Sequence, residues 1–598
     1  MCGITAIFAY KSDAPPVRLR ELESISQAMV RRGPDGSGHW LDNEKRIGLA
    51  HRRLSIIDLT AKASQPMTRN SLNGHKDRYR ITFNGEIYNF RVLREELEAK
   101  GVKFTTESDT EVLIRLYERD GPYMAEKLRG MFAFAIWDHV AQQLFLARDH
   151  FGVKPLYTAD DGKTLRVASQ VKALKAGMAN DSSGPDAAGY VGFFLFGSIP
   201  EPYTLHTNIR ALPAGSTLTV EKGGKRKKTC FFDPANVLKN SVKTGPSINT
   251  LRDIMLDSVK HHLVADVPIG LFLSSGLDSA TLAGLATEVS NTKINTITLG
   301  FEEFKNTQND EAPLAKTVAK HYKTQHYTEH ISRSQFMAAL PKVLSTMDQP
   351  SVDGVNTFFV ARAAANAGLK VALSGIGGDE LFAGYDTFTT VPKIARTLGT
   401  IPGINSFGKF FRTITGSLIR TMTSPKYASI LELGNTIGGA YFIRRGLFMP
   451  WELPEFMEPD MVHDGWKALE PISRLNDTVT GIPSPENKLR ILEMTMYMRN
   501  QLLRDADWAG MAHSLEIRVP LIDPILFSSL APLLGTTNSP TKRDMANTPR
   551  PALPDTILDR PKTGFSIPLE KWLSESPRDK FNLRLWAHKV FEPYIEQT

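Results

Sequence analysis

The sequence predicts a doubly wound α/β domain in its C-terminal half, preceded by a separate N-terminal domain. The chain has 598 residues, enough for about two to four domains with cores of their own. From Leu251 onward, helical and strand patterns alternate, as they do when helices cover a parallel sheet. Between Pro213 and Asn249 the pattern loosens into Gly, Lys, Ser and Pro, which indicates a domain boundary. We therefore expect a first domain over residues 2–213, a linker or hairpin over 214–247, and a second domain over 248–598.

The composition is that of an ordinary globular protein, with 41% hydrophobic and 23% charged residues. The sequence contains no run of about eighteen uncharged apolar residues and no secretory signal, so we expect a cytoplasmic protein without membrane contact. Its two cysteines, Cys2 and Cys230, are too few for a disulfide framework or a four-ligand zinc site. A reducing compartment fits this usage.

The net charge of +8 raises the question of nucleic-acid binding. The only dense basic run is 225–228, which follows two glycines and lacks interleaved aromatic residues. We interpret it as a solvated turn between two short strands, and we expect no nucleic-acid partner.

In the N-terminal half, two helices are predicted by their apolar spacing and end signals. One spans 90–100, with Leu93 and Leu97 on one face, and ends before a glycine. The other opens on the capping box 108–111 and runs to about Arg119. Asp109 lies in its first turn, where the ordinary role of a carboxylate is to complement the helix dipole.

Several N-terminal residues have chemical as well as structural interpretations. If Met1 is removed, Cys2 carries a thiol nucleophile and an α-amine that acts as its base, although a cysteine near an end is more often a small apolar residue. Asn84 and Gly85 offer an amide and an N–H for an oxyanion hole, although a hairpin turn is the default explanation of Asn-Gly. Arg53 suits a ligand carboxylate and equally suits an exposed position.

In the C-terminal half, a predicted strand at 269–273 runs into a turn rich in Ser and Gly, followed by a helix. Ser274, Ser275, Gly276 and Ser279 offer N–H groups and hydroxyls to phosphate oxygens at the positive end of that helix. A Walker-type lysine is absent, so transfer of a γ-phosphoryl group is disfavoured. Taken alone, such a turn is more often plain loop chemistry.

A second loop, 374–380, follows the predicted strand 370–374, and both loops should open on one crevice. Asp278, Asp379 and Glu380 would repel a triphosphate unless Mg²⁺ lies between them. Helix capping is the structural alternative, and it suits Asp278 better than the adjacent pair.

The N-terminal motifs together resemble the glutaminase domain of the N-terminal-nucleophile (class II) amidotransferases. In order, the motifs are Cys2-Gly-Ile, 32–36 (RGPDG), 53–55 (RLS), 83–89 (FNGEIYN), 108–111 (SDTE), 130–135 (GMFAFA) and 148–157 (RDHFGVKPLY). The resemblance covers about Cys2 to Pro213 and implies an αββα sandwich in which Cys2 attacks the side-chain amide of glutamine.

This resemblance also implies roles for single residues. Asn84 and Gly85 would hold the oxyanion, Arg53 would bind the glutamine carboxylate, and Glu86 and Asp109 would bind its ammonium group. One departure is His150, where the family usually has Arg, and we do not expect it to affect the thiol chemistry.

A second resemblance joins the phosphate loop to two further stretches, 504–523 and 560–565, and spans about Leu251 to Leu573. This region resembles the synthetase domain of asparagine synthetase, which belongs to the ATP pyrophosphatase group. The resemblance implies that ATP is held by a set of loop residues: Leu273, Ser274, Ser275, Gly276, Asp278, Ser279, Ser374 and Gly375. It further implies that Asp278 and Asp379 serve Mg²⁺–pyrophosphate and that Lys562 meets developing phosphate charge, while Glu516 and Arg518 organise the site. The region 391–485 is only predicted to be mostly helical.

Together the resemblances imply a coupled reaction with glutamine, ATP and Mg²⁺. Cys2 frees ammonia from glutamine, and the second site converts a carboxylate and ATP into an acyl-adenylate that the ammonia attacks. We expect a largely apolar passage between the domains, because ammonia must travel unprotonated. We also expect a homodimer, which is common in the family.

The sequence leaves more than one acceptor carboxylate open. Aspartate is the leading candidate, yet Ile376 replaces an acidic residue that aspartate-using synthetases commonly have, and Trp508 replaces a basic one. Ser275 stands where glycine is usual. The alternative is amidation of another carboxylate, such as a uronic acid of a sugar nucleotide or polysaccharide, or a natural-product acid. A non-catalytic regulatory protein is a third hypothesis.

Overall fold

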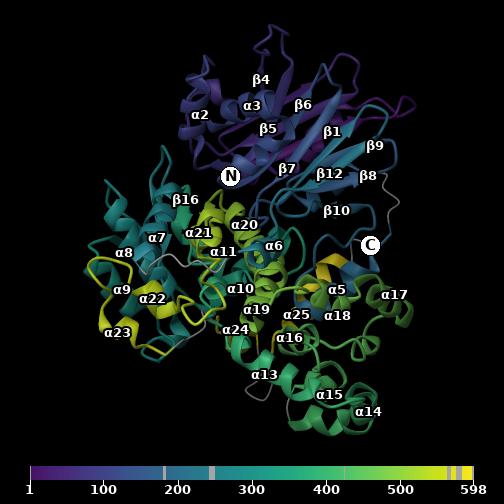
Figure 1. The fold of residues 1–598 in the computed structure, drawn as a ribbon, viewed down its shortest axis with the longest axis vertical. Coiled ribbons are helices and arrows are strands. Elements are labelled where there is room, and N and C mark those ends of the chain that lie inside the picture. Colours follow the sequence, from purple (N-terminus) through teal and green to yellow (C-terminus); the bar gives the residue numbers. More distant parts are fainter. Residues whose placement is uncertain are drawn as a thin grey trace.

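The protein has an all-antiparallel upper part and a mainly helical lower part built around a parallel sheet (Figure 1). The computed structural model describes residues 2–178, 184–241, 249–422, 424–561, 567–573 and 582–595. Among the described residues, no helix combines the length and the apolar character needed to cross a membrane.

The upper part contains two six-stranded antiparallel sheets. In spatial order, the first sheet consists of β10 (Ile209–Ala211), β8 (Tyr157–Asp160), β9 (Thr164–Ala168), β1 (Gly3–Ala9), β3 (Ile47–Arg53) and β2 (Gly36–Leu41). The second consists of β12 (Arg226–Cys230), β11 (Ser216–Glu221), β7 (Gln143–Arg148), β6 (Gly130–Asp138), β5 (Tyr79–Ile87) and β4 (Met67–Arg69).

The two sheets face each other across a core that follows the period-2 pattern of the strands. Ile4, Ala6 and Phe8 of β1 meet alternate residues of β6 such as Trp137. Helices α1 (Leu19–Ala28) and α4 (Val171–Gly177) contact each other beside the first sheet, and α2 (Phe90–Glu98) and α3 (Asp109–Asp120) lie on the second. The predicted αββα sandwich and both predicted helices are confirmed.

The basic run 225–228 is exposed, as expected, but residues 226–228 lie in strand β12 and not in the turn, and the hairpin belongs to the sandwich. β11 pairs with β7 from Ser216↔Arg148 to Glu221↔Gln143, and β12 extends the same sheet. Gly223 and Gly224 at the turn have φ of 93° and 92°, which favours glycine. The sheet therefore continues past residue 213, and we propose a domain boundary after Cys230 instead.

The lower part contains the predicted parallel sheet. Its spatial order is β15 (Gln325–Ile331), β14 (Asn295–Phe301), β13 (Ile269–Phe272), β16 (Val371–Leu373) and β17 (Glu516–Arg518). Helices α7 (Asn249–His262), α8 (Leu277–Val289), α9 (Ala312–His321), α10 (Arg333–Thr346) and α11 (Val355–Asn366) belong to the same unit. The doubly wound fold is confirmed, and α10 and β17 are elements that the sequence did not indicate.

The remaining helices complete the lower part, with α14 and α15 farthest from the sandwich (Figure 1). From the middle of the chain come α5 (Ala187–Phe196), α6 (Pro234–Asn240), α12 (Gly378–Leu381), α13 (Thr387–Gly399), α14 (Ile404–Met422), α15 (Ile430–Leu433), α16 (Ile437–Arg445), α17 (Pro459–Leu469) and α18 (Pro471–Thr478). The C-terminal ones are α19 (Pro485–Leu492), a π-helical segment (Glu493–Leu503), α20 (Arg504–Met511), α21 (Pro524–Leu530), α22 (Lys542–Ala546), α23 (Asp555–Leu558), α24 (Leu569–Leu573) and α25 (Leu583–Ile595). The prediction that 391–485 is mostly helical is confirmed.

Helix α5 ties the two parts together. It lies within the first predicted domain, yet it packs against α17, and Phe193 stacks on Phe591 of α25 with ring centroids 5.2 Å apart. Its apolar character on every side is typical of a helix buried all round. Burial of α5 in the lower core therefore stabilises the arrangement of the two halves.

Candidate functional site

Cys2 lies at the start of β1, buried beside the end of β5. Its backbone nitrogen donates a hydrogen bond to Asn84 Oδ1 at 2.9 Å, and its Sγ lies 3.9 Å from the carbonyl oxygen of Leu54. Burial raises the pKa of the Cys2 thiol, and the positive charge of the chain terminus opposes that rise. The structure thus brings together the predicted nucleophile and the predicted oxyanion residue.

Asn84 offers a buried donor for an oxyanion, and Gly85 lies beside it at a position that excludes a side chain. Asn84 is fully buried, and its Nδ2 has no hydrogen-bond partner among the described residues. An unused buried donor is costly, so it marks a place where a ligand oxygen is expected. Gly85 has a φ of 151°, and a Cβ there would lie 2.1 Å from the Met131 carbonyl oxygen. Only glycine fits this position.

The three predicted glutamine-binding residues lie near this end of β5 and β3. Burial raises the pKa of Asp109 to about 6, although the Ile87 N–H donates to its Oδ2 at 3.1 Å. Burial, then the nearby Glu516 carboxylate, raises the pKa of Glu86 well above its usual range. Arg53 is half-buried and donates to the carbonyls of Thr60, at 2.9 Å, and Asp58.

Charged side chains of the upper and lower parts meet at the interface beside this site. Arg32 donates to the Cys2 carbonyl oxygen at 3.0 Å and forms a bidentate pair with Asp507 at 2.6 and 2.9 Å. Arg518 donates to Glu516 at 2.7 Å and lies 3.7 Å from Glu86. The side chains beside Cys2 at the interface are thus charged, and the expected apolar passage between the domains stays a prediction.

The two predicted phosphate-site loops lie side by side because β13 and β16 pair in parallel, with Leu271 opposite Leu373. A Cβ on Gly375 would lie 2.9 Å from the Cβ of Asp278, so the loops touch. Between them lies a cavity of about 260 Å³. It is lined by most of the predicted ATP residues: Leu273, Ser274, Gly276, Asp278, Ser279, Ser374 and Gly375.

Hydrogen bonds from backbone N–H groups to serine hydroxyl groups fix the conformation of the first loop. The Ser274 N–H donates to Ser279 Oγ at 3.0 Å, and the Gly276 N–H donates to Ser274 Oγ at 3.1 Å. Helix α8 starts at Leu277, so its positive end faces the loop. Ser275 lines a neighbouring cavity of about 600 Å³ together with Gly276 and Asp278. This arrangement suits phosphate groups that extend from one cavity into the other.

The predicted metal ligands, Asp278 and Asp379, both contact the Nζ of Lys542, which lies 2.8 Å from Asp379. Among the described residues, no three His, Cys, Asp or Glu side chains are grouped to hold a metal ion. Mg²⁺ is usually bound by one or two carboxylates together with substrate phosphates. Two carboxylates that converge on one cation beside a phosphate loop fit that requirement.

Lys542 itself was not predicted from the sequence. It lies far along the chain on the short helix α22, and a lysine beside an ordinary helix start gives no local signal. The capping box Thr541–Asp544, which the sequence analysis did not use, could have shown that a helix starts here.

Three further residues were singled out from the sequence, and one of them lies outside the described residues. Glu380 is buried, accepts from the Tyr385 hydroxyl at 2.9 Å, and has a pKa raised to about 7 by burial and then Asp379. It is not among the residues that line the two cavities, so its place beside the phosphates stays a prediction. Trp508 is buried and donates to Asp505 at 2.7 Å. Lys562 falls in the stretch 562–566, outside the described residues.

Two further carboxylates, Asp353 and Asp505, line the 260 Å³ cavity. Burial, then the nearby Asp353, raises the pKa of Asp505 to about 8. The Ser351 hydroxyl donates to Asp505 at 2.8 Å. Ile376 lines the same cavity, so an apolar side chain is present where an acidic one was anticipated for aspartate chemistry.

Comparison with known proteins gives two adjoining family matches. Residues 1–231 match the glutamine amidotransferase domain family, and residues 250–592 match the asparagine synthase family. The chain is 33% identical to asparagine synthetase [glutamine-hydrolyzing] 1 of Bacillus subtilis, over 99% of this chain and 90% of that protein. It is 32% identical to asparagine synthetase B of Escherichia coli, over 66% of each.

Among solved structures, the glutamine phosphoribosylpyrophosphate amidotransferase of B. subtilis covers 57% of this chain and 92% of its own. The identity is 13% and the TM-score is 0.31, which is too low to support a conclusion about this chain.

Proposed function

The chain belongs to the glutamine-hydrolysing asparagine synthetase family, and on that premise we propose that it transfers ammonia from glutamine to a carboxylate that it activates with ATP. It is an ATP-dependent glutamine amidotransferase.

The first half-reaction uses the enclosed site. With Met1 removed, the α-amine of Cys2 takes the thiol proton as Sγ attacks the side-chain carbonyl carbon of glutamine, and the oxyanion is held by Asn84 Nδ2 and the Gly85 N–H. The same amine returns the proton to the leaving nitrogen as the C–N bond breaks, which releases ammonia and leaves a γ-glutamyl thioester that water hydrolyses to glutamate. Arg53, Asp109 and Glu86 hold the two charged groups of glutamine.

The second half-reaction uses the crevice between the loops. An oxygen of the acceptor carboxylate attacks the α-phosphorus of ATP, which forms an acyl-adenylate and releases pyrophosphate. Asp278 and Asp379 would hold Mg²⁺, which supplies charge neutralisation for the phosphates. Lys542 and Lys562 supply further positive charge to the leaving pyrophosphate. Ammonia then attacks the acyl carbon, and AMP departs.

Aspartate is the first candidate acceptor, because the relatives are named for asparagine formation. A different carboxylate, such as a uronic acid, is the second candidate. It is favoured by Ile376, whose apolar side chain cannot itself bind or deprotonate an amino group.

The observation that carries the proposal is the buried connection between the two sites. Arg32 bonds to the backbone of the nucleophile and to Asp507, and Asp507 lies on the same helix as Asp505, which lines the crevice. The Arg32–Asp507 pair is buried, although removing two charges from water is unfavourable in free energy. This supports a function that needs both sites held in register.

The Cys2→Ala variant tests the proposal. We expect glutamine hydrolysis to fall at least about 10³-fold, because the nucleophile is lost. AMP and amide should still form from ammonium chloride. Cys230→Ala, at an exposed cysteine, is the matched control and should change neither activity. Hydrolysis no lower than in the parent would refute the assignment of Cys2, and a non-catalytic regulatory protein would show no AMP under either condition.

A further inference from the structure

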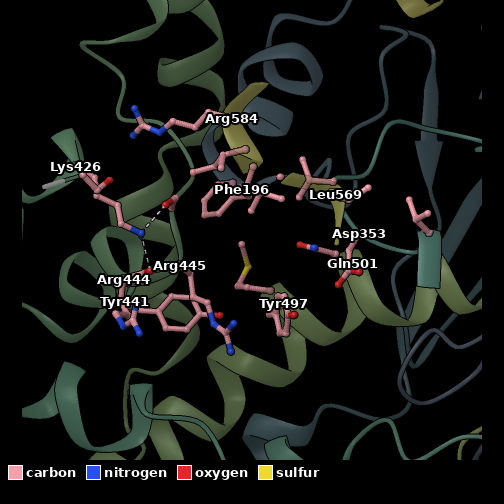
Figure 2. A pocket seen from close by; sticks show the side chains of 18 of the residues that line it. Phe196, Asp353, Lys426, Tyr441, Arg444, Arg445, Tyr497, Gln501, Leu569 and Arg584 are labelled. Atoms are coloured by element: carbon pink, nitrogen blue, oxygen red, sulfur yellow. Dashed lines mark hydrogen bonds between the residues drawn. The ribbon is translucent and has the colours of Figure 1, made fainter. Parts of the chain in front are cut away.

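A third cavity, of about 540 Å³, adjoins the 260 Å³ cavity between the two phosphate-site loops, which we call the nucleotide crevice. The two share Asp353 and Asn356 at the start of α11. The third cavity is also lined by the segment 424–426, α16, the π-helical segment, the end of α5 and the C-terminal helices α24 and α25 (Figure 2). No step of the proposed reaction yet uses this space, which we call the basic cavity.

Four cationic side chains line the basic cavity: Lys426, Arg444, Arg445 and Arg584. Asp353 is the only carboxylate among its described lining residues. Figure 2 shows the cations on one side of the hollow, and Asp353 with Gln501 on the other. The cavity is therefore polarised, with its basic end opposite the wall that it shares with the nucleotide crevice.

The three arginines are fixed by carboxylates. Arg445 pairs with Glu493 at 2.8 Å, Arg584 pairs with Glu452 at 2.6 Å, and Arg444 pairs with Asp386. Glu493 and Glu452 are buried. These pairs orient the guanidinium groups, whose remaining N–H donors suit the oxygens of a phosphate or carboxylate.

Lys426 has no carboxylate partner among the described residues. Its ammonium donates to the carbonyl oxygens of Arg444 and Gly446, both at 3.0 Å. Burial, then the guanidinium groups of Arg444, Arg584 and Arg445, lowers its pKa to about 8. An ammonium repelled by neighbouring cations is stabilised by an anion, so this end of the cavity favours an anionic ligand.

The walls between the two ends are apolar and aromatic. Phe196, Tyr441 and Tyr497 line the space, and the Arg445 guanidinium lies 3.9 Å from the centroid of the Tyr497 ring. The volume falls within the range of about 300–1,000 Å³ that holds drug-sized ligands, which are larger than free aspartate. A ring or carbon chain fits between the shared wall and the cations.

We propose that the basic cavity binds the distal part of the acceptor, and that the acceptor is a carboxylic acid larger than aspartate with a second anionic group, phosphate or carboxylate. The carboxylate to be activated faces the wall shared with the nucleotide crevice, and the second anion meets Lys426 and the arginines. This inference rests on the proposed function and names its substrate class.

A matched series of acids tests the inference. Glucuronic acid carries one anionic group, glucaric acid carries a second carboxylate, and glucuronic acid 1-phosphate carries a phosphate. Acceptor-dependent AMP formation is measured for each acid and for L-aspartate, with glutamine, ATP and Mg²⁺ present. We expect a KM at least about tenfold lower for one or both dianionic acids than for glucuronic acid, because charge-assisted hydrogen bonds are the strong ones. The acid with the lower KM shows whether the second anionic group is a phosphate or a carboxylate.

Lys426→Met links that difference to the cavity. It should raise the KM for the preferred dianionic acid about tenfold, and it should leave glutamine hydrolysis and the KM for ATP unchanged. Lys409→Met, at an exposed lysine of α14 outside the cavity, is the matched control. If Lys426→Met does not fold, as judged by thermal unfolding, the acid series on the parent chain decides alone.

The outcomes separate the two proposals. Absence of AMP with both dianionic acids at millimolar concentration overturns the inference, and so does AMP formation that Lys426→Met leaves within about twofold. If L-aspartate turns over in either case, the proposed function survives. If no acid yields AMP and no glutamate forms, the proposed function fails as well.

Discussion

The Cys2 site and the crevice beside the phosphate loop differ in how the chain builds them. The Cys2 site draws its predicted residues from the first 109 residues, on strands of two packed sheets and one helix start, and its key side chains are buried. The crevice and its neighbours draw residues from Phe196 to Arg584 and enclose cavities of about 260, 540 and 600 Å³.

This difference separates the two substrates. In the Cys2 site a glycine that admits no side chain and a buried amide leave little room for variation, so the site is suited to a single small donor. In the lower part, the walls come from helices that are far apart in sequence. Substitutions there change which acceptor fits while the sheet and the phosphate loop stay the same, which is how one fold serves different substrates.

The largest effect is expected for a substitution of Lys542, which should impair one site and spare the other. Lys542→Met should lower AMP formation by at least about 10²-fold, because it removes positive charge from the phosphates and leaves Asp278 and Asp379 repelling them. Glutamine hydrolysis should persist. Lys320→Met, at an exposed lysine of α9, serves as control. Equal losses of both activities would show that Lys542 supports the fold and not one site.

A smaller effect is expected where the two sites meet. Asp507→Asn leaves the buried Arg32 guanidinium without its counter-charge, which should lower the free energy of unfolding by about 3–5 kcal/mol. Amide formation from glutamine should fall more than amide formation from ammonium chloride. Denaturant unfolding and paired assays measure both.

The control for this pair is Asp559→Asn, which breaks the exposed pair with Arg543 at 3.2 Å. Exposed ion pairs contribute less than about 1 kcal/mol, so its unfolding curve should stay close to that of the parent. A similar shift in both variants would contradict a special role for the Arg32–Asp507 connection.

The smallest effect concerns the pH dependence of the Cys2 site. The pKa of Asp109 is raised to about 6, so this carboxylate is charged above that pH and neutral below it. If it binds the glutamine ammonium group, the KM for glutamine should rise as the pH falls through about 6. Asp109→Asn should raise the KM at pH 8 and flatten the profile. A parallel profile in the variant would assign the titration to another group.

Local sequence patterns predicted the parts that depend on local physics. The phosphate loop follows from a strand, a glycine-rich turn and a helix start: β13 lies within one residue of the expected bounds, and α8 follows the turn as expected. The Asn84-Gly85 pair continues a strand instead of turning, because β6 pairs along its whole length. The hairpin over 216–230 was placed outside the first domain, since its pairing with β7 has no local signal.

The residues that the sequence did not reveal act through long-range contacts. Lys542 meets Asp278 across 264 positions, and Arg32 meets Asp507 across 475. Glu380 follows Asp379 directly, yet it turns into the core towards Tyr385, and adjacency in sequence could not show this. The basic cavity collects cations from three separate segments that carry no shared motif.

The most direct test is a product balance by mass spectrometry. The parent chain is incubated with glutamine, ATP, Mg²⁺ and either L-aspartate or glucuronic acid 1-phosphate, and glutamate, amide, AMP and ADP are followed together. The account predicts amide, glutamate and AMP in equal amounts with one of these acceptors, and no ADP. Formation of ADP in place of AMP, or AMP without amide when glutamine is supplied, would contradict the coupling of the two sites.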